Sequence, residues 1–277
     1  MNLYVKGKII RNYYDLGNSQ IHFRYLYKSR KTPALIMLHD SPGSSFELEN
    51  LVKYFGSTRS VISIDLPGYG YSDNINIKNP TIYKFSRYVI KLIKHLGIQT
   101  YDIYGRGFGG LVAAEVSKYS SRRVILDRVH FYSIAEKKSL IKNYILYSKL
   151  NEDGSHLYKV WTMLKDHKVF SPWYDKNQVK VDHSIADFDP KKLHQLLVDI
   201  FSNTSTYYSL IEASISYKLE KELSNISKPI LFLIEESEKM PAKLTRENNS
   251  RFKRQICIES INVKTVNKKI LSFLDSI

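Results

Sequence analysis

The chain has 277 residues, 43% of them hydrophobic, and a formal net charge of +15. A chain of this length can bury roughly three quarters of its unfolded surface, so it can form a large core. No stretch is long and apolar enough to span a bilayer, and residues 1–8 lack the apolar segment of a secretory signal. The single cysteine, Cys257, excludes an internal disulfide and suits a reducing cytoplasm, where we expect the protein.

The positive charge has two interpretations. It can attract an acidic partner, such as nucleic acid, an anionic membrane or an acidic carrier protein. It can also reflect a composition rich in Lys, Ile, Tyr and Asn, which is the interpretation we favour. Basic pairs such as Arg122-Arg123, Lys137-Lys138 and Lys268-Lys269 are scattered along the chain, so we expect no dense basic stripe on any one helix. No nucleic-acid-binding motif is present.

Strands are predicted where short apolar or aromatic runs lie between turn signals. The runs at 34–38 and 61–64 are continuously apolar, which is typical of strands buried on both faces of a sheet. In chain order, strands are expected at 3–10, 20–27, 34–38, 61–64, 101–104, 128–133, 230–234 and about 255–258.

Helices are predicted between these strands. One is expected at about 46–54, and another begins after Pro80-Thr81 and ends at Gly97, with apolar residues at three- and four-residue steps. Strands that alternate with helices indicate an α/β protein with a mostly parallel sheet. Residues 135–224 interrupt the alternation with mainly helical sequence. We therefore expect a core of residues 1–134 and 225–277 and an inserted helical lid of residues 135–224.

A glycine-rich turn, Gly105-Arg106-Gly107-Phe108-Gly109-Gly110, lies between a predicted strand and a predicted helix. This setting is typical of the G-x-S-x-G elbow, which holds a nucleophile in a strained conformation. The middle residue is Gly107, which has no side chain to attack a substrate. Glycine tolerates a positive φ, so it would relieve the strain that a nucleophile imposes.

Three further segments extend the pattern. Residues 38–44 are similar to an H-G-x-P-G loop, residues 65–73 to a D-x-x-G-x-G-x-S-D loop, and residues 226–234 to an I-x-x-P-x-L strand. With the elbow, they make the chain resemble the α/β-hydrolase superfamily, in particular its lidded esterases, iminopeptidases, dehalogenases and epoxide hydrolases. The resemblance covers residues 3–134 and 225–277 and implies an α/β-hydrolase fold.

The same resemblance implies a catalytic triad with two of its three positions lost. The nucleophile position is Gly107, the acid aligns best with Glu238, and the histidine region around Asn262 contains no histidine. A serine–histidine–acid relay needs the imidazole within hydrogen-bond reach of both partners. We therefore do not expect serine-hydrolase activity.

Three residues near the elbow are candidate pocket residues. His39 could polarise a carbonyl, although a structural hydrogen bond is the favoured role. Asp40 replaces the glycine usual in the family and would repel an oxyanion; it could instead face a cation or cap the turn. Arg106 could bind an acidic ligand or form an ion pair with Asp40.

Aromatic residues supply the other candidates. Phe108, Trp161 and Trp173 could line a ligand pocket under the lid, or pack the lid on the core. Asp182-His183, Asp187 and Asp189 match no strong metal-ligand spacing, so we expect a solvated acidic loop. We expect neither a metal nor a cofactor.

Three functional interpretations remain open. The favoured one is a non-catalytic protein of this fold that binds a small-molecule ligand or a partner, for which the N-myc downstream-regulated family is a precedent. The second is an atypical hydrolase or lyase that uses His39, Asp40, Arg106 and Glu238. The third is a basic adaptor that docks an acidic carrier protein through a positive face at the mouth of the lid.

Overall fold

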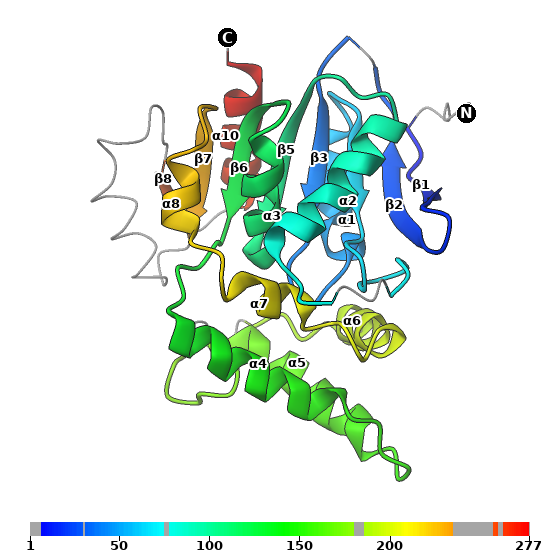
Figure 1. Cartoon of the computed structure of the whole chain (residues 1–277), viewed down its shortest axis with the longest axis vertical. Coiled ribbons are helices and arrows are strands. Elements are labelled where there is room, and N and C mark those ends of the chain that lie inside the picture. The colour runs from blue at the N-terminus through cyan, green and yellow to red at the C-terminus, as the bar shows by residue number, and fades with distance from the viewer. Residues whose placement is uncertain are drawn as a thin grey trace.

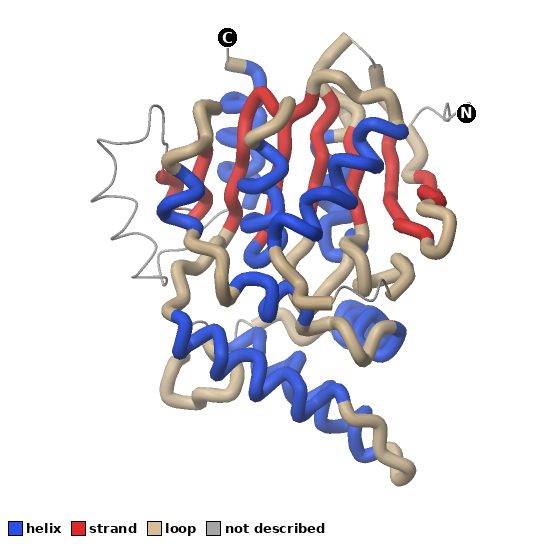
Figure 2. The backbone as a smooth tube through the Cα atoms, viewed as in Figure 1, coloured by secondary structure: helices blue, strands red, loops and turns tan. Residues whose placement is uncertain are grey.

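The computed structural model describes residues 7–29, 31–74, 78–179, 186–234, 257–259 and 263–276. Within them, an eight-stranded sheet has the order β1-β2-β4-β3-β5-β6-β7-β8, with helices on both faces (Figures 1 and 2). β2 pairs antiparallel with β1 and with β4, whereas the other neighbours are parallel. The strands are β1 (Ile10–Asp15), β2 (Gln20–Leu26), β3 (Ala34–Leu38), β4 (Val61–Ile64), β5 (Tyr101–Arg106), β6 (Ser121–Asp127), β7 (Ile230–Ile234) and β8 (Cys257–Glu259).

Helices cover the sheet in two layers, one on each side. α2 and α3 pack on one face together with Ile36, whereas α1 and α10 cover the other face together with Leu35. Alternate residues of β3 thus enter different cores, which confirms the prediction of a strand buried on both faces. The helices are η1 (Ser45–Leu48), α1 (Glu49–Phe55), α2 (Ile82–His95), α3 (Gly107–Ser117), α4 (Ile134–Ser148), α5 (Ser155–Val169), α6 (Pro190–Ser202), α7 (Ser209–Ser214), α8 (Leu219–Leu223) and α10 (Val263–Asp275).

Two strand predictions were wrong. The first described strand is β1 at Ile10–Asp15, whereas the prediction was 3–10; residues 7–9 are not in a strand, and residues 3–6 lie outside the described region. Asp15 pairs with Gln20 and leaves a short turn closed by the hydrogen bond from Leu16 N to Ser19 O. The sixth strand is Ser121–Asp127 rather than 128–133. Its residues pair in parallel with both β5 and β7, and Arg128, at φ 51°, turns the chain out of the sheet.

The segment between β6 and β7 supplies α4, α5, α6 and α7, which lie beyond the carboxyl ends of the parallel strands (Figure 1). Hydrogen bonds attach it to the strand-end loops. Ser41 Oγ donates to the carbonyl of Tyr207 (2.9 Å), Ser44 Oγ to Asp199 Oδ2 (2.5 Å), and Asn203 Nδ2 to the carbonyl of Gly70 (2.9 Å). The helices therefore lie against the end of the sheet where the elbow is found.

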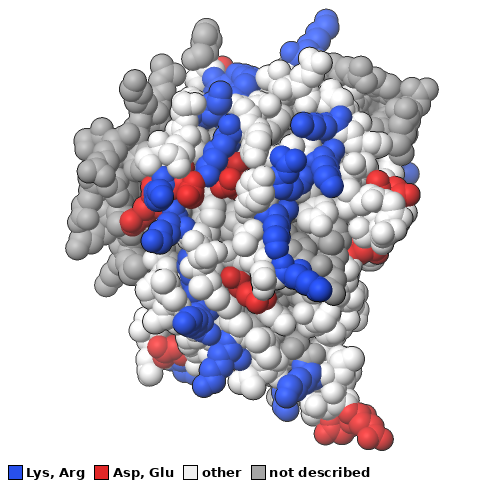
Figure 3. Space-filling model, in the orientation of Figure 1, with Lys and Arg blue, Asp and Glu red and all other residues white. Residues whose placement is uncertain are grey.

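The surface of α2 contradicts the expectation that basic residues are scattered. Lys84, Arg87, Lys91 and Lys94 recur at steps of three, four and three residues, which places all four on the exposed side of the helix. Figure 3 shows Lys and Arg following this helix. The sequence carried this signal in its spacing, but a search for adjacent basic pairs overlooks it.

None of the helices described by the structure is long and apolar enough to cross a membrane.

Candidate functional site

The elbow between β5 and α3 is built by two glycines with separate roles. Gly107 begins α3 with φ +50°, a conformation that disfavours residues with a side chain. Gly109 lets the helix approach β3 closely, since a Cβ there would lie 2.0 Å from the carbonyl oxygen of His39. The strand–turn–helix geometry that the sequence predicted is therefore present.

Asp40 fills the space that a side chain at position 107 would occupy. A Cβ built on Gly107 would lie 2.1 Å from Cγ and from both carboxylate oxygens of Asp40. Asp40 directly follows the buried strand β3 and its neighbouring residue His39, so its side chain enters the elbow from the adjacent strand. A carboxyl group from a different segment thus lies where a nucleophile would stand.

The Asp40 carboxylate also accepts the hydrogen bond of the backbone amide at the elbow. Its Oδ1 accepts hydrogen bonds from Phe108 N (2.8 Å) and Ser41 N (2.7 Å). In elbows of this type, the amide of the residue after the nucleophile helps to stabilise the oxyanion. Burial raises the pKa of Asp40, although these two amides and the positive charges of Arg128 and Arg106 oppose the shift. The bond from Ser41 N shows that Asp40 caps its own turn, which was one of the roles predicted for it.

Glu47 is a second carboxyl group at this site, and the sequence analysis overlooked it. It lies in η1, and its Oε1 accepts a hydrogen bond from Asp40 N (2.8 Å). Burial raises the pKa of Glu47 to about 7; Arg106 opposes the shift, and the nearby Asp40 adds to it. The S-x-x-E spacing of Ser44 and Glu47 was the available signal, because it is typical of a helix start.

Arg106 does not form the predicted ion pair with Asp40. Its Nε lies 2.9 Å from Asp127 Oδ2, at the carboxyl end of the neighbouring strand β6. The Tyr104 hydroxyl donates to the same carboxylate, and Arg128 Nε lies 3.4 Å from Asp127 Oδ1. Burial alone would raise the pKa of Asp127, but Arg128, Arg106 and Tyr104 lower it to about 2. The pairing follows from the alternation of strand faces, which places Arg106 beside Asp127.

His39 is fully engaged with the backbone. Its Nε2 accepts from Leu66 N (3.0 Å), which requires the proton on Nδ1, and Nδ1 donates to the carbonyl of Asp40 (2.7 Å). The side chain is buried, and burial lowers its pKa. In this arrangement the imidazole joins the ends of β3 and β4 and has no nitrogen free to polarise a substrate.

The aromatic candidates lie in different places. Phe108 is half-buried at the elbow and stacks on Tyr132, with ring centroids 6.1 Å apart. Trp173 is buried beside Tyr144 and Tyr147, and no hydrogen-bond partner of its Nε1 lies among the described residues. Trp161 is half-buried against the core. That these three line one ligand pocket remains a prediction.

Of the predicted acidic loop, only Asp187 and Asp189 lie within the described residues. Asp189 caps α6 by accepting from Lys191 N (2.9 Å), and Asp187 pairs with Lys192 Nζ (2.5 Å). Asp182 and His183 lie outside the described residues. Among the residues that are described, no group of three or more His, Cys, Asp or Glu side chains could hold a metal ion.

Comparisons with known proteins agree with this architecture. An α/β hydrolase from a Medee basin deep-sea metagenome, MGS-M2, superimposes with a TM-score of 0.74 at 16% identity over 96% of this chain and 98% of that one. The enol-lactonase of Burkholderia xenovorans LB400 gives 0.72 at 18% over 96% and 100%, and epoxide hydrolase A of Mycobacterium thermoresistibile gives 0.72 at 15% over 96% and 98%. The chain has the α/β-hydrolase fold.

Sequence relatives cover less of the chain. Epoxide hydrolase 1 of Oryctolagus cuniculus is 28% identical over 113 residues, which are 35% of this chain and 25% of that protein. The mesoderm-specific transcript homolog protein of Homo sapiens is 28% identical over 148 residues, 50% of this chain and 43% of that protein. The chain therefore spans less than half the length of these relatives. No family model matches it.

Within this α/β-hydrolase fold, the three triad positions that the resemblance implies have different standing. Gly107 lies at the elbow, as expected. Glu238 and Asn262 lie outside the described residues, so their roles remain predictions. The described structure assembles charged groups at the carboxyl ends of β3, β5 and β6, namely Asp40, Glu47, Arg106, Asp127 and Arg128.

Proposed function

We propose that this protein is a non-catalytic member of the α/β-hydrolase fold that binds a ligand or a partner. The observation that carries the proposal is the position of the Asp40 carboxylate. The carboxylate fills the space that a side chain at residue 107 would need, and it accepts the hydrogen bond of the Phe108 amide. A negative charge at that amide opposes a developing oxyanion, and Gly107 offers no nucleophile.

His39 and Arg106 support the same proposal. Both side chains have protein partners, since His39 bonds to the backbone and Arg106 pairs with Asp127. Neither group is left to act on a substrate. An active enzyme normally keeps its reactive groups accessible and uses surrounding residues to orient them.

Hydrolysis assays of the purified protein test this proposal. We expect no turnover of p-nitrophenyl esters or haloalkanes above background from the natural chain, from Gly107→Ser or from the double variant Asp40→Gly/Gly107→Ser. The double variant restores room for a serine, but the sequence has no histidine at the position around Asn262 where the family places the base that takes the hydroxyl proton. An acyl-enzyme burst from either serine variant would show that a base is present.

A second candidate function rests on the contact between Glu47 and Asp40. A carboxyl group with a pKa of about 7 can both donate and accept a proton near neutral pH, as a general acid–base must. An atypical hydrolase or lyase would then use Asp40 and Glu47. Of the other residues expected for it, His39 and Arg106 have protein partners, and Glu238 lies outside the described residues.

The assay for this alternative is turnover of an ester, haloalkane and epoxide panel as a function of pH. The alternative predicts a rate that changes near pH 7 and is lost in Glu47→Gln, while Glu220→Gln, at an exposed carboxylate, keeps it. Turnover lost with Glu47 and retained in the control would overturn the non-catalytic proposal.

A further inference from the structure

The exposed side of α2 is a strip of unbalanced positive charge. We call Lys84, Arg87, Lys91 and Lys94 the α2 basic face; they occupy successive turns of the helix and extend over about 15 Å. The opposite side of α2, including Phe85, Val89 and Leu92, is buried against the sheet. The helix is therefore anchored on one side and presents cations on the other (Figure 3).

No acidic residue lies on α2 or in the segments that flank it in the chain. The sequence contains neither Asp nor Glu between Asp73 and Asp102. In the described part of the chain, no ion pair involves any of the four residues; Lys84 Nζ donates to the carbonyls of Lys78 and Asn79 instead. Elsewhere, Lys53 and Lys118 each pair with a glutamate. Like charges at three- and four-residue spacing destabilise a helix slightly, and an acidic partner on this side would relieve that repulsion.

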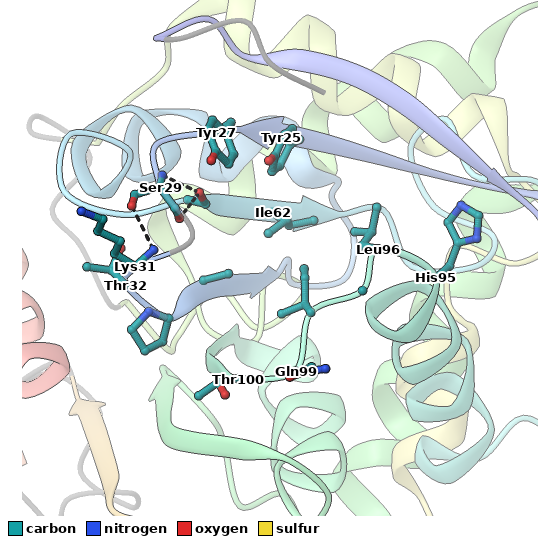
Figure 4. A pocket seen from close by; sticks show the side chains of 15 residues that line it. Tyr25, Tyr27, Ser29, Lys31, Thr32, Ile62, His95, Leu96, Gln99 and Thr100 are labelled. Carbon is teal, nitrogen blue, oxygen red and sulfur yellow. Dashed lines mark hydrogen bonds between the residues drawn. The ribbon is translucent and has the colours of Figure 1, made fainter. Parts of the chain in front are cut away.

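A pocket of about 750 Å³ opens at the carboxyl-terminal end of α2, at the sheet edge opposite the elbow. Figure 4 shows Tyr25 and Tyr27 along one wall and Gln99 and Thr100 across from them, with Ile62 between. Apolar Ala34, Leu96 and Ile98 also line it, while Lys31 and His95 lie at its two ends. Its volume is that of a ligand-sized pocket, and its lining mixes apolar and polar side chains in similar measure, so it can take one side chain of a partner.

We propose that the α2 basic face and this pocket form one docking surface for an acidic helical segment of a partner protein. A helix that carries carboxylates at steps of three, four and three residues matches the four cations along α2. An apolar side chain near its end would enter the pocket beside Tyr25 and Ile62. Charge matching along the strip sets the orientation, and the pocket adds specificity.

The shape of the surface favours a protein helix over other polyanions. The cations form a single line on a convex helix, whereas single-stranded nucleic acid is held in a basic groove with aromatic rings along its length. A membrane-binding helix inserts an apolar face beside its cations. The apolar side of α2 is already buried in the core.

The test measures binding by fluorescence anisotropy of a labelled 15-residue helical peptide with Glu at the matching spacing and Leu near one end. We expect saturable binding that weakens as salt is added and is at least tenfold weaker for a scrambled peptide. Reversing the charge of the α2 basic face in K84E/R87E/K91E/K94E is expected to weaken binding by more than tenfold. The control K138E/K142E/K159E/K218E changes net charge equally at exposed lysines and is expected to weaken it less than threefold.

A second experiment tests the contribution of the pocket to peptide binding separately. Thr100→Trp places a bulky ring at an exposed lining position, so we expect weaker binding of the Leu peptide and unchanged binding of its Ala counterpart. Circular dichroism checks the fold of each variant. If the charge reversal unfolds the chain, the four-glutamine variant replaces it, with an expected loss of at least threefold.

Equal losses in the strip and control variants would overturn the proposal, because binding would then follow net charge alone. Tighter binding to a 20-nucleotide single strand or to phosphatidylserine vesicles would overturn it in favour of those partners. The strip lies on α2 and not among the elbow residues, so the result is independent of whether the elbow proves catalytic.

Discussion

Asp65 and Asp40 follow two neighbouring strands, yet their carboxylates differ sharply. Asp65, after β4, is buried and accepts hydrogen bonds from His22 Nδ1 (2.7 Å), Ser45 N (2.6 Å) and Tyr71 N (3.0 Å). Burial would raise the pKa of Asp65, but the hydrogen bond and charge of His22, the charge of His39 and the amide of Tyr71 together lower it. Asp40, after β3, is half-buried, and burial raises its pKa; the amides of Phe108 and Ser41 oppose this shift without cancelling it.

The difference indicates that the loop after β4 is structural, whereas the loop after β3 carries a candidate functional group. The Asp65 loop ties together β2, η1 and the 65–73 turn, so its carboxylate is part of the framework. At Asp40 the same residue type meets a partly open site and a neighbouring carboxyl group, Glu47. A carboxyl group whose pKa is raised by burial is a better candidate for function than one whose negative charge is stabilised by several hydrogen bonds.

The largest expected effect comes from removing the buried carboxylate. Asp65→Ala is expected to lower the free energy of unfolding by about 3–5 kcal/mol, since it leaves the buried His22 and the amides of Ser45 and Tyr71 without their partner. Asp40→Ala is expected to lower it by about 1 kcal/mol. Urea denaturation at pH 7 measures both. Similar losses for the two variants would break the comparison.

The pH dependence of stability follows from the same contrast. The pKa of Asp65 is lowered on folding, so its contribution is present above its ordinary value of 3.8 and is lost as pH falls through the lower folded pKa. The pKa of Asp40 is raised, so its ionisation costs stability as pH rises above 3.8.

A smaller effect is expected from filling the space at the elbow. Gly107→Ala is expected to lower the free energy of unfolding by about 2–4 kcal/mol, because the new methyl group overlaps Asp40 and the residue has a positive φ. Gly97→Ala is the matched control. Gly97 also has a positive φ of 67°, but its Cβ would meet nothing within 4 Å, so only the backbone cost of about 1 kcal/mol remains.

The double variant Asp40→Gly/Gly107→Ala separates overlap from backbone strain. We expect it to recover most of the difference between Gly107→Ala and Gly97→Ala, as measured by a double-mutant cycle in urea. Equal stability of the Gly107→Ala and Gly97→Ala variants would show that the Asp40 side chain moves away freely.

A smaller, pH-dependent effect is expected at Glu47. Its folded pKa of about 7 exceeds its ordinary value of 4.5, so the folded state binds more protons between these values and stability falls as pH rises through this window. Glu47→Gln still accepts from Asp40 N and is expected to be more stable than the natural chain by on the order of 1–2 kcal/mol at pH 8. At pH 4 the two should be equal.

Thermal unfolding across pH 4–8 measures this difference, with Glu220→Gln as the exposed control. Parallel curves for the natural chain and Glu47→Gln would show that Glu47 ionises as it does in the unfolded chain. A separation that grows above pH 5 would support Glu47 as the proton-exchanging group of the site.

Most of the fold was predictable from local patterns. The apolar runs of β3 and β4, the apolar periodicity of α2 and the strand–turn–helix at the elbow all appear within a few residues of their predicted positions. The predicted strand at 128–133 failed because strand membership depends on pairing. Only the register with β5 and β7 selects residues 121–127.

The sequence alone determined the elements, the α/β alternation and the absence of a side chain at residue 107, because each is a property of a contiguous segment. The tertiary structure decided which charges meet. Arg106 lies beside Asp127 and not Asp40, because neighbouring strands place residues of the same face together. Asp40 enters the space beside Gly107, although 66 residues separate them in the chain, because β3 and β5 are adjacent in the sheet. Such contacts depend on strand order, which a local pattern does not encode.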